Sequence, residues 1–428
     1  MKLTLLTTAM VFAGFATAVP MVQPQSFSDG YISPLYNPVE GEALTDSYII
    51  VLKEDTHHEK FQQHTSWINQ LSLKNHPAAQ WLDESNSHGI HHVYNMPVLK
   101  GYAGKFDAAT LQSIRTSEDV AYVEKDSLVY ASELQRDAPW GLARLAHRKR
   151  LSLLTFNKYE YDPQGGDGVK VYVIDTGINT QHVDFDGRAT WGATIPSGDE
   201  DADGNGHGSH CAGTIAGSKY GVAKLAQPVA VKVLRSNGSG SMSDVLKGVD
   251  WATEAHLQDA DDAAKKGKKY KGAVANMSLG GGKSPSLDMA VNSAVDSGLI
   301  FAVAAGNDNK DACNYSPARA EKAITVGASN LFDEIAPFSN HGRCVDVFAP
   351  GVDILSIWRG SKYATNTISG TSMASPHVAG LAAYLLSLEE NPITPEEMKK
   401  KILELSTRGV LDKLPRDTPN LLIYNGAY

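Results

Sequence analysis

The chain has 428 residues, of which 42% are hydrophobic and 20% charged, a composition that can bury a core and excludes a disordered polymer. Its length favours two or three domains. The net charge is −9, from 39 basic and 48 acidic side chains, so no nucleic acid is expected as a partner. Three cysteines exclude a disulfide-built scaffold but leave room for one bridge.

The N-terminus has the three parts of a secretory signal peptide. Lys2 supplies a positive charge, Leu3 to Phe15 is a short apolar stretch, and Ala16-Thr17-Ala18 is a small-residue cleavage site. Beyond this segment no run of 18 apolar residues occurs, so no transmembrane span is expected. We therefore predict a signal peptide at 1–18 that directs the chain into the secretory route.

The next part of the chain predicts a small α+β domain. Residues 19–45, rich in Pro, Ser and Gly, are expected to be a linker. The elements expected after it are a strand at 47–53, a helix at 57–82, strands at 93–99 and 101–106, a helix at 107–117 and a strand at 120–130. This β-α-β-β-α-β order predicts a ferredoxin-like domain over 46–131.

From residue 132 onward apolar runs alternate with helical stretches. The runs at 169–174, 229–234, 273–277 and 299–305 are continuous in Val, Ala, Ile and similar residues, without polar alternation. Such runs between helices are typical of parallel strands that are covered on both sides. We therefore predict an α/β domain over 132–428, with a mainly parallel sheet and helices on both faces.

Four residues in this domain predict nucleophilic catalysis by a serine. Asp175 ends a buried run, His207 follows a glycine-rich turn at the start of a helix, and Ser372 lies near another helix N-terminus. His207 can take the serine proton, and Asp175 would hold the imidazole tautomer. Asn307, at another strand end, could donate with the Ser372 N–H to an oxyanion, a contribution of roughly 3 kcal/mol.

The sequence also contains residues typical of two other enzyme chemistries. Asp175-Thr176-Gly177 and Asp296-Ser297-Gly298 mimic the paired motifs of aspartic proteases, but the alternating β/α pattern argues against an all-β body. His207, His210 and Cys211 are zinc-type ligands that lack the H-E-x-x-H arrangement, and His207 is better explained as a base.

Two further interpretations of the sequence are a phosphate-binding loop and a protein that binds peptides without cleaving them. The run Gly280 to Ser284 resembles a phosphate-binding loop but has Met277 where that loop needs its first glycine. A catalytically inactive, peptide-binding protein is disfavoured because all four positions of the predicted catalytic set carry working residue types.

The sequence resembles subtilisin-family serine proteases of the proteinase K branch, above all the fungal vacuolar proteases called cerevisins. The resemblance covers 139–428, through DTG at Asp175, HGSHCAGT at His207, NMSLGGG at Asn276, AAGN at Ala304 and GTSMASPH at Gly370. It extends less specifically to 46–131, which resembles the family's inhibitory propeptide. Five motifs in the family's order leave chance a remote explanation.

By this resemblance, Asp175, His207 and Ser372 are a catalytic triad and Asn307 is the oxyanion residue. It implies a monomeric serine endopeptidase that cleaves proteins and peptides with broad, apolar-leaning specificity. Two edge segments would pair with the substrate main chain, which gives affinity without demanding particular side chains. The expected substrate-binding residues of these segments and of an apolar pocket are Gly238, Ser239, Gly240, Ser278, Leu279, Gly280, Ala304 and Gly306.

The resemblance further implies a zymogen that processes itself. The propeptide is expected to inhibit the catalytic domain within the same chain, and to be cut near Tyr130 to Asp137. Of the three possible cysteine pairings, the resemblance implies a Cys313–Cys344 disulfide with Cys211 free. The expected destination is the vacuole lumen, with export from the cell as the alternative.

Catalysis by the triad needs no cofactor. A structural calcium site and one glycosylation site are nevertheless expected. Asp346, with the backbone oxygens of Glu321 and Ala323, matches a calcium site of the proteinase K branch, and hard oxygen ligands suit Ca²⁺. Glycosylation sequons begin at Asn237, Asn276 and Asn314; Asn237 is the predicted acceptor, because Asn276 falls in an expected core strand and a proline follows the third sequon.

Half of the histidines lie in the propeptide region. We hypothesise that those buried there become charged as the pH falls along the secretory route and so weaken the propeptide fold. The alternative is a solvated polar helix face without a sensing role. The seven residues, of 14 in the chain, are His57, His58, His64, His76, His88, His91 and His92.

Overall fold

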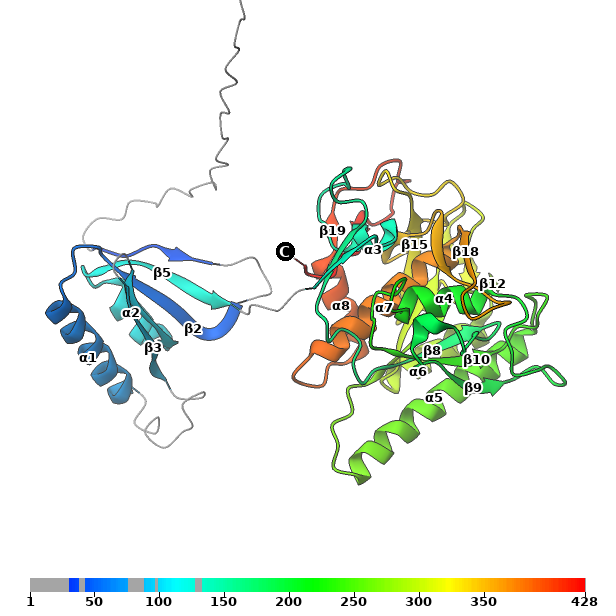
Figure 1. Cartoon of the computed structure of the whole chain (residues 1–428), viewed down its shortest axis with the longest axis horizontal. Helices are drawn as coiled ribbons and strands as arrows, with labels where there is room; N and C mark the ends of the chain where they lie inside the picture. Colours follow the sequence, from blue (N-terminus) through cyan, green and yellow to red (C-terminus); the bar gives the residue numbers. More distant parts are fainter. Residues whose placement is uncertain (1–30, 38–42, 76–87, 97–98, 128–132, 428) are drawn as a thin grey trace, which may run out of the picture. The chain divides into compact units, whose positions relative to one another are not determined.

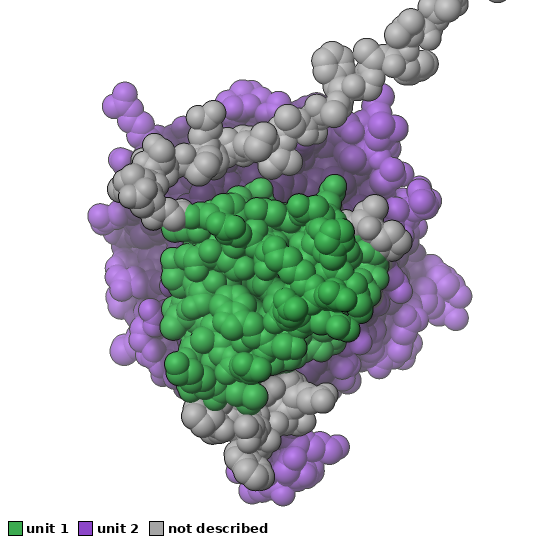
Figure 2. Space-filling view, turned by 90° about the vertical axis from the view of Figure 1, so that its left-hand side faces the viewer, with its two compact units in different colours: residues 1–130 green, residues 131–428 purple. Residues whose placement is uncertain are grey.

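The computed structural model describes residues 31–37, 43–75, 88–96, 99–127 and 133–427. The chain divides into two compact units, residues 1–130 and residues 131–428 (Figures 1 and 2). The expected signal peptide at 1–18 lies outside the described residues. Within the described parts of the chain, no helix combines the length and the apolar character that crossing a membrane requires.

The first unit has a five-stranded sheet in the order β1-β5-β2-β4-β3. Its two helices pack against each other, and their buried residues share a core with the strands, around Ile50, Phe61, Tyr102 and Ile114. The expected α+β arrangement is confirmed. The elements are β1 (Leu35–Tyr36), β2 (Ala43–Leu52), α1 (His58–Asn75), β3 (Gly89–Asn95), β4 (Lys100–Lys105), α2 (Ala108–Arg115) and β5 (Val120–Ser127).

Part of the expected linker belongs to this unit. Leu35–Tyr36 is a strand that pairs in parallel with β5, and β2 begins at Ala43. Ser33 is fully buried, and its backbone N–H donates to Arg115 O at 2.7 Å. The linker prediction is therefore wrong for these residues. Composition does not reveal that the exposed edge of β5 offers backbone partners to an adjoining segment.

The strand expected at 93–99 is shifted along the chain. It covers Gly89–Asn95 rather than 93–99, and after it Met96 and Leu99 hydrogen-bond to each other through their backbones just before β4 begins. Helix α1 is described as far as Asn75, and the remainder of the helix expected at 57–82 lies outside the described residues.

The second unit is built on a nine-stranded sheet in the order β19-β20-β16-β15-β13-β11-β8-β10-β9. Every pairing in it is parallel except that of β19 with β20. Its strands are β8 (Lys170–Asp175), β9 (Thr190–Thr194), β10 (Gln227–Lys232), β11 (Ala273–Met277), β13 (Ile300–Ala304), β15 (Ile324–Ser329), β16 (Val347–Pro350), β19 (Thr407–Arg408) and β20 (Leu421–Leu422).

Helices cover both faces of this sheet. Along β8, Val171 and Val173 belong to one core cluster and Tyr172 and Ile174 to the other, as the alternation of side chains along a strand requires. The first cluster includes residues of α4, α7 and α8, and the second includes residues of α5 and α6. The predicted α/β fold is confirmed. The helices are α3 (Trp140–Leu145), α4 (His207–Ala216), α5 (Met242–Lys265), α6 (Pro285–Asp296), α7 (Thr371–Leu388) and α8 (Pro395–Leu405).

Three two-stranded sheets complete the second unit. They pair β6 (Glu133–Arg136) with β7 (Lys158–Tyr161), β12 (Gly281–Gly282) with β14 (Tyr315–Ser316), and β17 (Ile354–Ile357) with β18 (Thr365–Ile368). All three pairs are antiparallel.

Candidate active site

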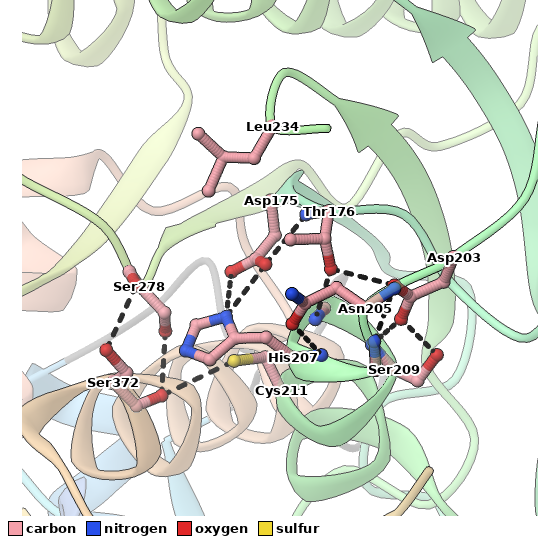
Figure 3. Close-up of polar contacts among 12 residues, drawn as sticks. Asp175, Thr176, Asp203, Asn205, His207, Ser209, Cys211, Leu234, Ser278 and Ser372 are labelled. Atoms are coloured by element: carbon pink, nitrogen blue, oxygen red, sulfur yellow. Dashed lines mark hydrogen bonds and ion pairs between the residues drawn. The ribbon is translucent and has the colours of Figure 1, made fainter. Parts of the chain in front are cut away.

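The predicted acid and base are brought together at the carboxyl end of β8. Asp175 is the last residue of β8 and is fully buried, while His207 is the first residue of α4 (Figure 3). His207 Nδ1 donates to the Asp175 carboxylate, at 2.8 Å from Oδ1 and 3.0 Å from Oδ2. The proton therefore lies on Nδ1, and Nε2, which faces Ser372 in Figure 3, is left as the basic nitrogen.

The start of α4 is held by side chains that satisfy its free N–H groups. His207 N donates to Asn205 Oδ1 at 3.3 Å, Gly208 N to Thr176 Oγ1 at 2.9 Å, and Ser209 N to Asp203 Oδ2 at 3.0 Å. These are three of the N–H groups that a helix leaves without internal partners. They tie the turn that carries His207 to the residue after Asp175.

Asp203 is the centre of this arrangement. Its carboxylate also accepts hydrogen bonds from Thr176 Oγ1 at 2.9 Å, from Gly206 N at 2.8 Å and from Ser209 Oγ at 2.6 Å (Figure 3). Gly206 has φ +106°, and a Cβ there would meet the Trp358 ring at 2.5 Å, so only glycine fits this turn. These hydrogen bonds and the glycine therefore fix the conformation of the loop that leads into α4.

The charge state of His207 is set by opposing effects. Burial, the largest, lowers its pKa, but the Asp175 carboxylate, the hydrogen bond to it and the charge of Asp203 together outweigh burial and hold the pKa above the ordinary histidine value. The raised pKa makes the neutral imidazole of His207 a stronger base, and the same surroundings stabilise the imidazolium that forms once it has accepted a proton.

The predicted nucleophile lies in the first turn of α7. Ser372 is the second residue of this helix, and its Oγ donates to Ser278 O at 3.0 Å. Ser278 Oγ in turn donates to Ser372 O at 2.8 Å, so two hydrogen bonds join these residues (Figure 3). The hydroxyl must turn from Ser278 toward His207 before it can give up its proton. Catalytic hydrogen bonds of this kind often form only when substrate is bound.

A buried polar network holds the same region of α7 against β11. Asn276 donates to Ser278 Oγ at 2.9 Å and accepts from Ser375 Oγ at 2.8 Å. Asn276 is fully buried, which argues against its use as a glycosylation site. The Asn-Met-Ser segment of the sequence therefore orients the serine helix.

Asn307 follows β13 and is oriented by the helix that carries Ser372. Its Oδ1 accepts hydrogen bonds from Thr371 N at 2.8 Å and from Thr371 Oγ1 at 2.9 Å. Because Oδ1 is engaged, the donor Nδ2 is the end of the amide left for the pocket that Asn307 and Ser372 both line.

That pocket has a volume of about 270 Å³ and contains four of the eight predicted substrate-binding residues: Leu279, Gly280, Ala304 and Gly306. Ser278 lies beside it, bonded to Ser372. Gly306 has φ +103°, and a Cβ there would meet Asn340 Nδ2 at 2.3 Å. Residues that the sequence interpretation missed also line the pocket, namely Gly281, Gly282, Ala305, Asp308, Tyr315, Ser316, Ala318 and Thr371.

The other predicted edge segment, Gly238 to Gly240, is an exposed loop between β10 and α5 and does not line this pocket. The Ser239 O atom accepts a hydrogen bond from Arg235 N at 2.8 Å, which closes a tight turn. Asn237, the predicted glycosylation acceptor, is exposed in the same loop.

The cysteines have the arrangement that the resemblance implied. Cys313 and Cys344 form a disulfide, and Cys211 is fully buried with a free thiol. The disulfide lies beside β14, one wall of the pocket. Cys211 Sγ donates to Ser372 O at 3.4 Å, and burial raises the pKa of the thiol well above its ordinary value.

The geometry also bears on the alternative chemistries. His210 Nε2 donates to Ile354 O at 2.8 Å, so its ring is engaged elsewhere and does not join His207 and Cys211 as a third zinc ligand. Asp296 precedes β13 whereas Asp175 ends β8. In this parallel sheet the two carboxylates therefore lie at opposite ends of the strands. They cannot form an aspartic protease pair.

The residues of the expected calcium site come together around a different cation. Lys399 Nζ lies 2.9 Å from Asp346 Oδ2, 3.0 Å from Glu321 O and 2.7 Å from Ala323 O. An ammonium group therefore stands where the calcium ion was expected, and the ligand set does not fit calcium while Lys399 is in place.

Besides the pocket residues, of which Thr371 is one, sequence reasoning also missed Asp203 and Lys232 near the site. Asp203 lies four residues before His207, and Thr371 directly precedes Ser372. Their residue type and their place beside the motifs were therefore available signals. Lys232 carried none. It ends β10, is fully buried, and donates from Nζ to Thr176 O and Leu234 O, both at 2.9 Å.

Comparison with known proteins agrees with this geometry. Residues 166–418 match the subtilase family, and residues 47–132 match the peptidase inhibitor I9 family. The catalytic unit with its Asp, His and Ser side chains is that of a serine protease, and the chain belongs to the subtilase family.

Relatives from fungi share most of the chain. It is 54% identical to the subtilisin-like serine protease Pen c 2 of Penicillium citrinum, over 96% of this chain and 94% of that protein. It is 53% identical to alkaline protease 2 of Aspergillus fumigatus, over 92% of this chain and 84% of that protein. A crystal structure of a cold-adapted subtilisin-like serine proteinase is 44% identical, with a TM-score of 0.60, and covers 68% of this chain and 98% of that one.

Proposed function

We propose that this protease is an endopeptidase in which Ser372 Oγ attacks the scissile carbonyl and His207 Nε2 takes the serine proton. His207 then gives that proton to the leaving amine, and water completes hydrolysis of the acyl-enzyme in a second, equivalent step. Asp175 keeps the imidazole in the required tautomer and stabilises the imidazolium. The Asn307 Nδ2 and Ser372 N–H groups donate to the oxyanion of each tetrahedral intermediate.

The observation that carries this proposal is the pair of hydrogen bonds from His207 Nδ1 to the buried Asp175 carboxylate, at 2.8 and 3.0 Å. A buried carboxylate bonded to the inner nitrogen of an imidazole is the arrangement that makes the outer nitrogen a base. The position of Ser372 at a helix N-terminus supports its role, because the helix dipole favours the negative charge that develops there.

The proposed specificity is broad and apolar-leaning. Small and apolar residues such as Leu279, Gly280 and Ala304 line much of the pocket, which favours an apolar side chain before the cleaved bond. A series of peptides that differ only at that residue would test this. We expect kcat/KM to be highest for large apolar residues, and a preference for acidic residues would contradict the proposal.

We further propose that the protein is a monomeric zymogen that cuts itself. The match of residues 47–132 to an inhibitor family supports an inhibitory propeptide. Strand β6 begins at Glu133 and is paired with β7 along its length, which supports a cut before Glu133 rather than within 133–137. A peptide bond must be extended and unpaired to enter a protease cleft.

Replacement of the nucleophile tests catalysis and self-processing together. The Ser372→Ala chain, produced alone, should remain at full length and should not react with a fluorophosphonate. The matched control is Ser369→Ala, because Ser369 is exposed and lies three residues away. Full maturation of Ser372→Ala without added protease would overturn the self-cleavage proposal.

The proposed compartment is the lumen of the vacuole. It rests on the signal-like segment at 1–18 and on the resemblance to vacuolar cerevisins. N-terminal sequencing of the mature enzyme from isolated vacuoles and from culture medium gives both the cut and the location. Mature enzyme found in the medium alone would establish export from the cell instead.

A further inference from the structure

The side chain of Lys399 joins three segments of the catalytic unit at the amino ends of the strands, the end of the sheet opposite the triad. Lys399 belongs to α8, Glu321 and Ala323 lie in the turn that enters β15, and Asp346 directly precedes β16. β15 and β16 are parallel neighbours, so these segments meet at the amino ends of the strands. Asp175, in contrast, lies at a carboxyl end.

The ammonium group is fully satisfied by these segments. Nζ carries three N–H donors, and it has three acceptors: Asp346 Oδ2 at 2.9 Å, Glu321 O at 3.0 Å and Ala323 O at 2.7 Å. The side chains of Lys399 and Asp346 are only 19% and 23% exposed. This is a well-matched, partly buried contact rather than a mobile surface ion pair.

The acceptors are held in place independently of the lysine. Asp346 Oδ2 also accepts from Thr325 N at 2.8 Å, and Asp346 N donates to Thr325 O at 2.9 Å. Met398 and Ile402, on either side of Lys399 in α8, are fully buried and anchor the helix. The Asp346 carboxylate and the lysine stem are therefore each positioned by their own surroundings.

The same three oxygens are of the kind that binds calcium, which prefers carboxylate and carbonyl oxygen at 2.3–2.6 Å. An ion at that distance from all three would overlap the Lys399 Nζ position. The positive charges of a calcium ion and of the Lys399 ammonium would also repel each other strongly at such a separation. The single negative charge of Asp346, the one carboxylate present, cannot neutralise both. Calcium and the lysine exclude each other.

We propose that Lys399 is a built-in replacement for a calcium ion at this site, and that removal of its ammonium group opens a site that accepts calcium. A bound ion stabilises a protein only while it is present in solution, by an amount that depends on its concentration. A cation attached to the chain is not lost to a chelator. The catalytic unit thus keeps this clamp between β15, β16 and α8 where calcium is scarce.

The test compares the calcium response of four full-length chains, all carrying Ser372→Ala to prevent self-digestion. They are the parent, Asp346→Asn, Lys399→Met and the double variant Lys399→Met/Asp346→Asn. Methionine keeps the length and apolar stem of lysine without its charge. The matched control is Lys400→Met, which removes a charge from the same helix at a side chain that is 74% exposed. The melting temperature of the catalytic unit is measured in EDTA and in millimolar calcium.

We expect calcium to change the melting temperatures of the parent, of Asp346→Asn and of Lys400→Met by the same amount, whatever other calcium sites the protein has. In Lys399→Met calcium should add a further rise of about 5 °C when it is present at about 100 times its Kd. That added rise should disappear in the double variant. Terbium luminescence, which reports ion binding directly, should increase by one site in Lys399→Met only.

Two results would overturn the proposal. If Asp346→Asn removes part of the calcium response of the parent chain, calcium binds beside Lys399 and the lysine does not replace it. If the calcium response and the terbium stoichiometry are the same in all the chains, the three oxygens do not form a cation site when the ammonium is removed.

Discussion

Asn307 accepts two hydrogen bonds from Thr371 at a single side-chain oxygen, one from the backbone N–H at 2.8 Å and one from the hydroxyl at 2.9 Å. Thr371 Oγ1 also accepts from Gly306 N at 3.1 Å, so the threonine links the loop after β13 to the start of α7. Asn307 Nδ2 and Ser372 N, the two donors of the proposed oxyanion site, are thereby set relative to each other by Thr371.

The first prediction concerns this amide. Asn307→Ala should lower kcat by about 10²- to 10³-fold with little change in KM, a range established for loss of this donor in a subtilisin. Thr371→Val should cause a smaller loss, because the amide keeps one of its two hydrogen bonds, and Thr371→Ser should retain activity. Steady-state kinetics on a peptide substrate would show this, and equal losses for Thr371→Val and Thr371→Ser would argue against the orienting role.

The second prediction concerns the pH dependence of activity. Only the neutral imidazole can act as the base, so kcat/KM should rise with pH through the His207 pKa, which Asp175 holds above the ordinary value. Asp175→Asn removes that charge and leaves burial, which lowers the pKa. We expect the acid limb of the profile to move to lower pH, and kcat near neutral pH to fall by about 10⁴-fold because the tautomer is lost.

A pH profile of kcat/KM for both proteins checks this prediction. An acid limb that stays at the same pH in Asp175→Asn would show that another group controls it. A limb that moves to higher pH would contradict the account of the His207 charge.

The third prediction narrows the propeptide histidine hypothesis to one residue. His64 is 4% exposed, and its Nε2 lies 3.0 Å from Tyr102 Oη. Burial lowers its pKa, although Asp119, 3.7 Å from Nδ1 and paired with Lys60, opposes this. His57, His58 and His92 are exposed, and His76 lies outside the described residues.

The sign follows from that direction. Because the folded pKa of His64 lies below the unfolded value of about 6.5, protonation favours the unfolded propeptide. The stability of the first unit should be retained above about pH 6.5 and fall as the pH drops below it. Urea unfolding of the Ser372→Ala chain at pH 7.5 and 5 should show this fall. His64→Gln should reduce it, and His58→Gln, at an exposed position, should not. The same pH dependence in His64→Gln would end the hypothesis.

The fourth prediction concerns a buried ion pair in the catalytic unit. Arg144 Nε donates to Asp333 Oδ1 at 2.7 Å, and the two side chains are 1% and 2% exposed. Asp333→Asn leaves the arginine charge buried without its partner and should lower the free energy of unfolding by about 3–5 kcal/mol. Asparagine tolerates the φ of +57° at this position, so backbone strain is not introduced.

Thermal or urea unfolding in the Ser372→Ala background measures this loss. Asp250→Asn, in an exposed pair with Lys247, is the control and should leave the unfolding transition where it is. The double variant Arg144→Met/Asp333→Asn, which also removes the unpaired charge and keeps asparagine at the positive φ, should be more stable than Asp333→Asn alone. A destabilisation no larger than that of Asp250→Asn would contradict the assignment of a buried charge pair.

Much of the fold and of the site could be predicted because the signals are local. The apolar run of β8 ends at Asp175, and glycines precede His207 where α4 begins. Periodicity identifies such elements, and catalytic chemistry restricts which residue types can stand at their ends. The strand β1 was missed for the corresponding reason, because Leu35 and Tyr36 have no pattern of their own and become a strand only by pairing with β5.

The sequence by itself thus determined the two units, the strands and helices that bear Asp175, His207, Ser372 and Asn307, and the chemistry of those side chains. Only the tertiary structure decided what stands at the expected calcium site, because Lys399 is separated from Asp346 along the chain by three strands and by helix α7. No local period relates two such residues. The order of strands in the sheet and the packing of α8 bring the ammonium to its three oxygens.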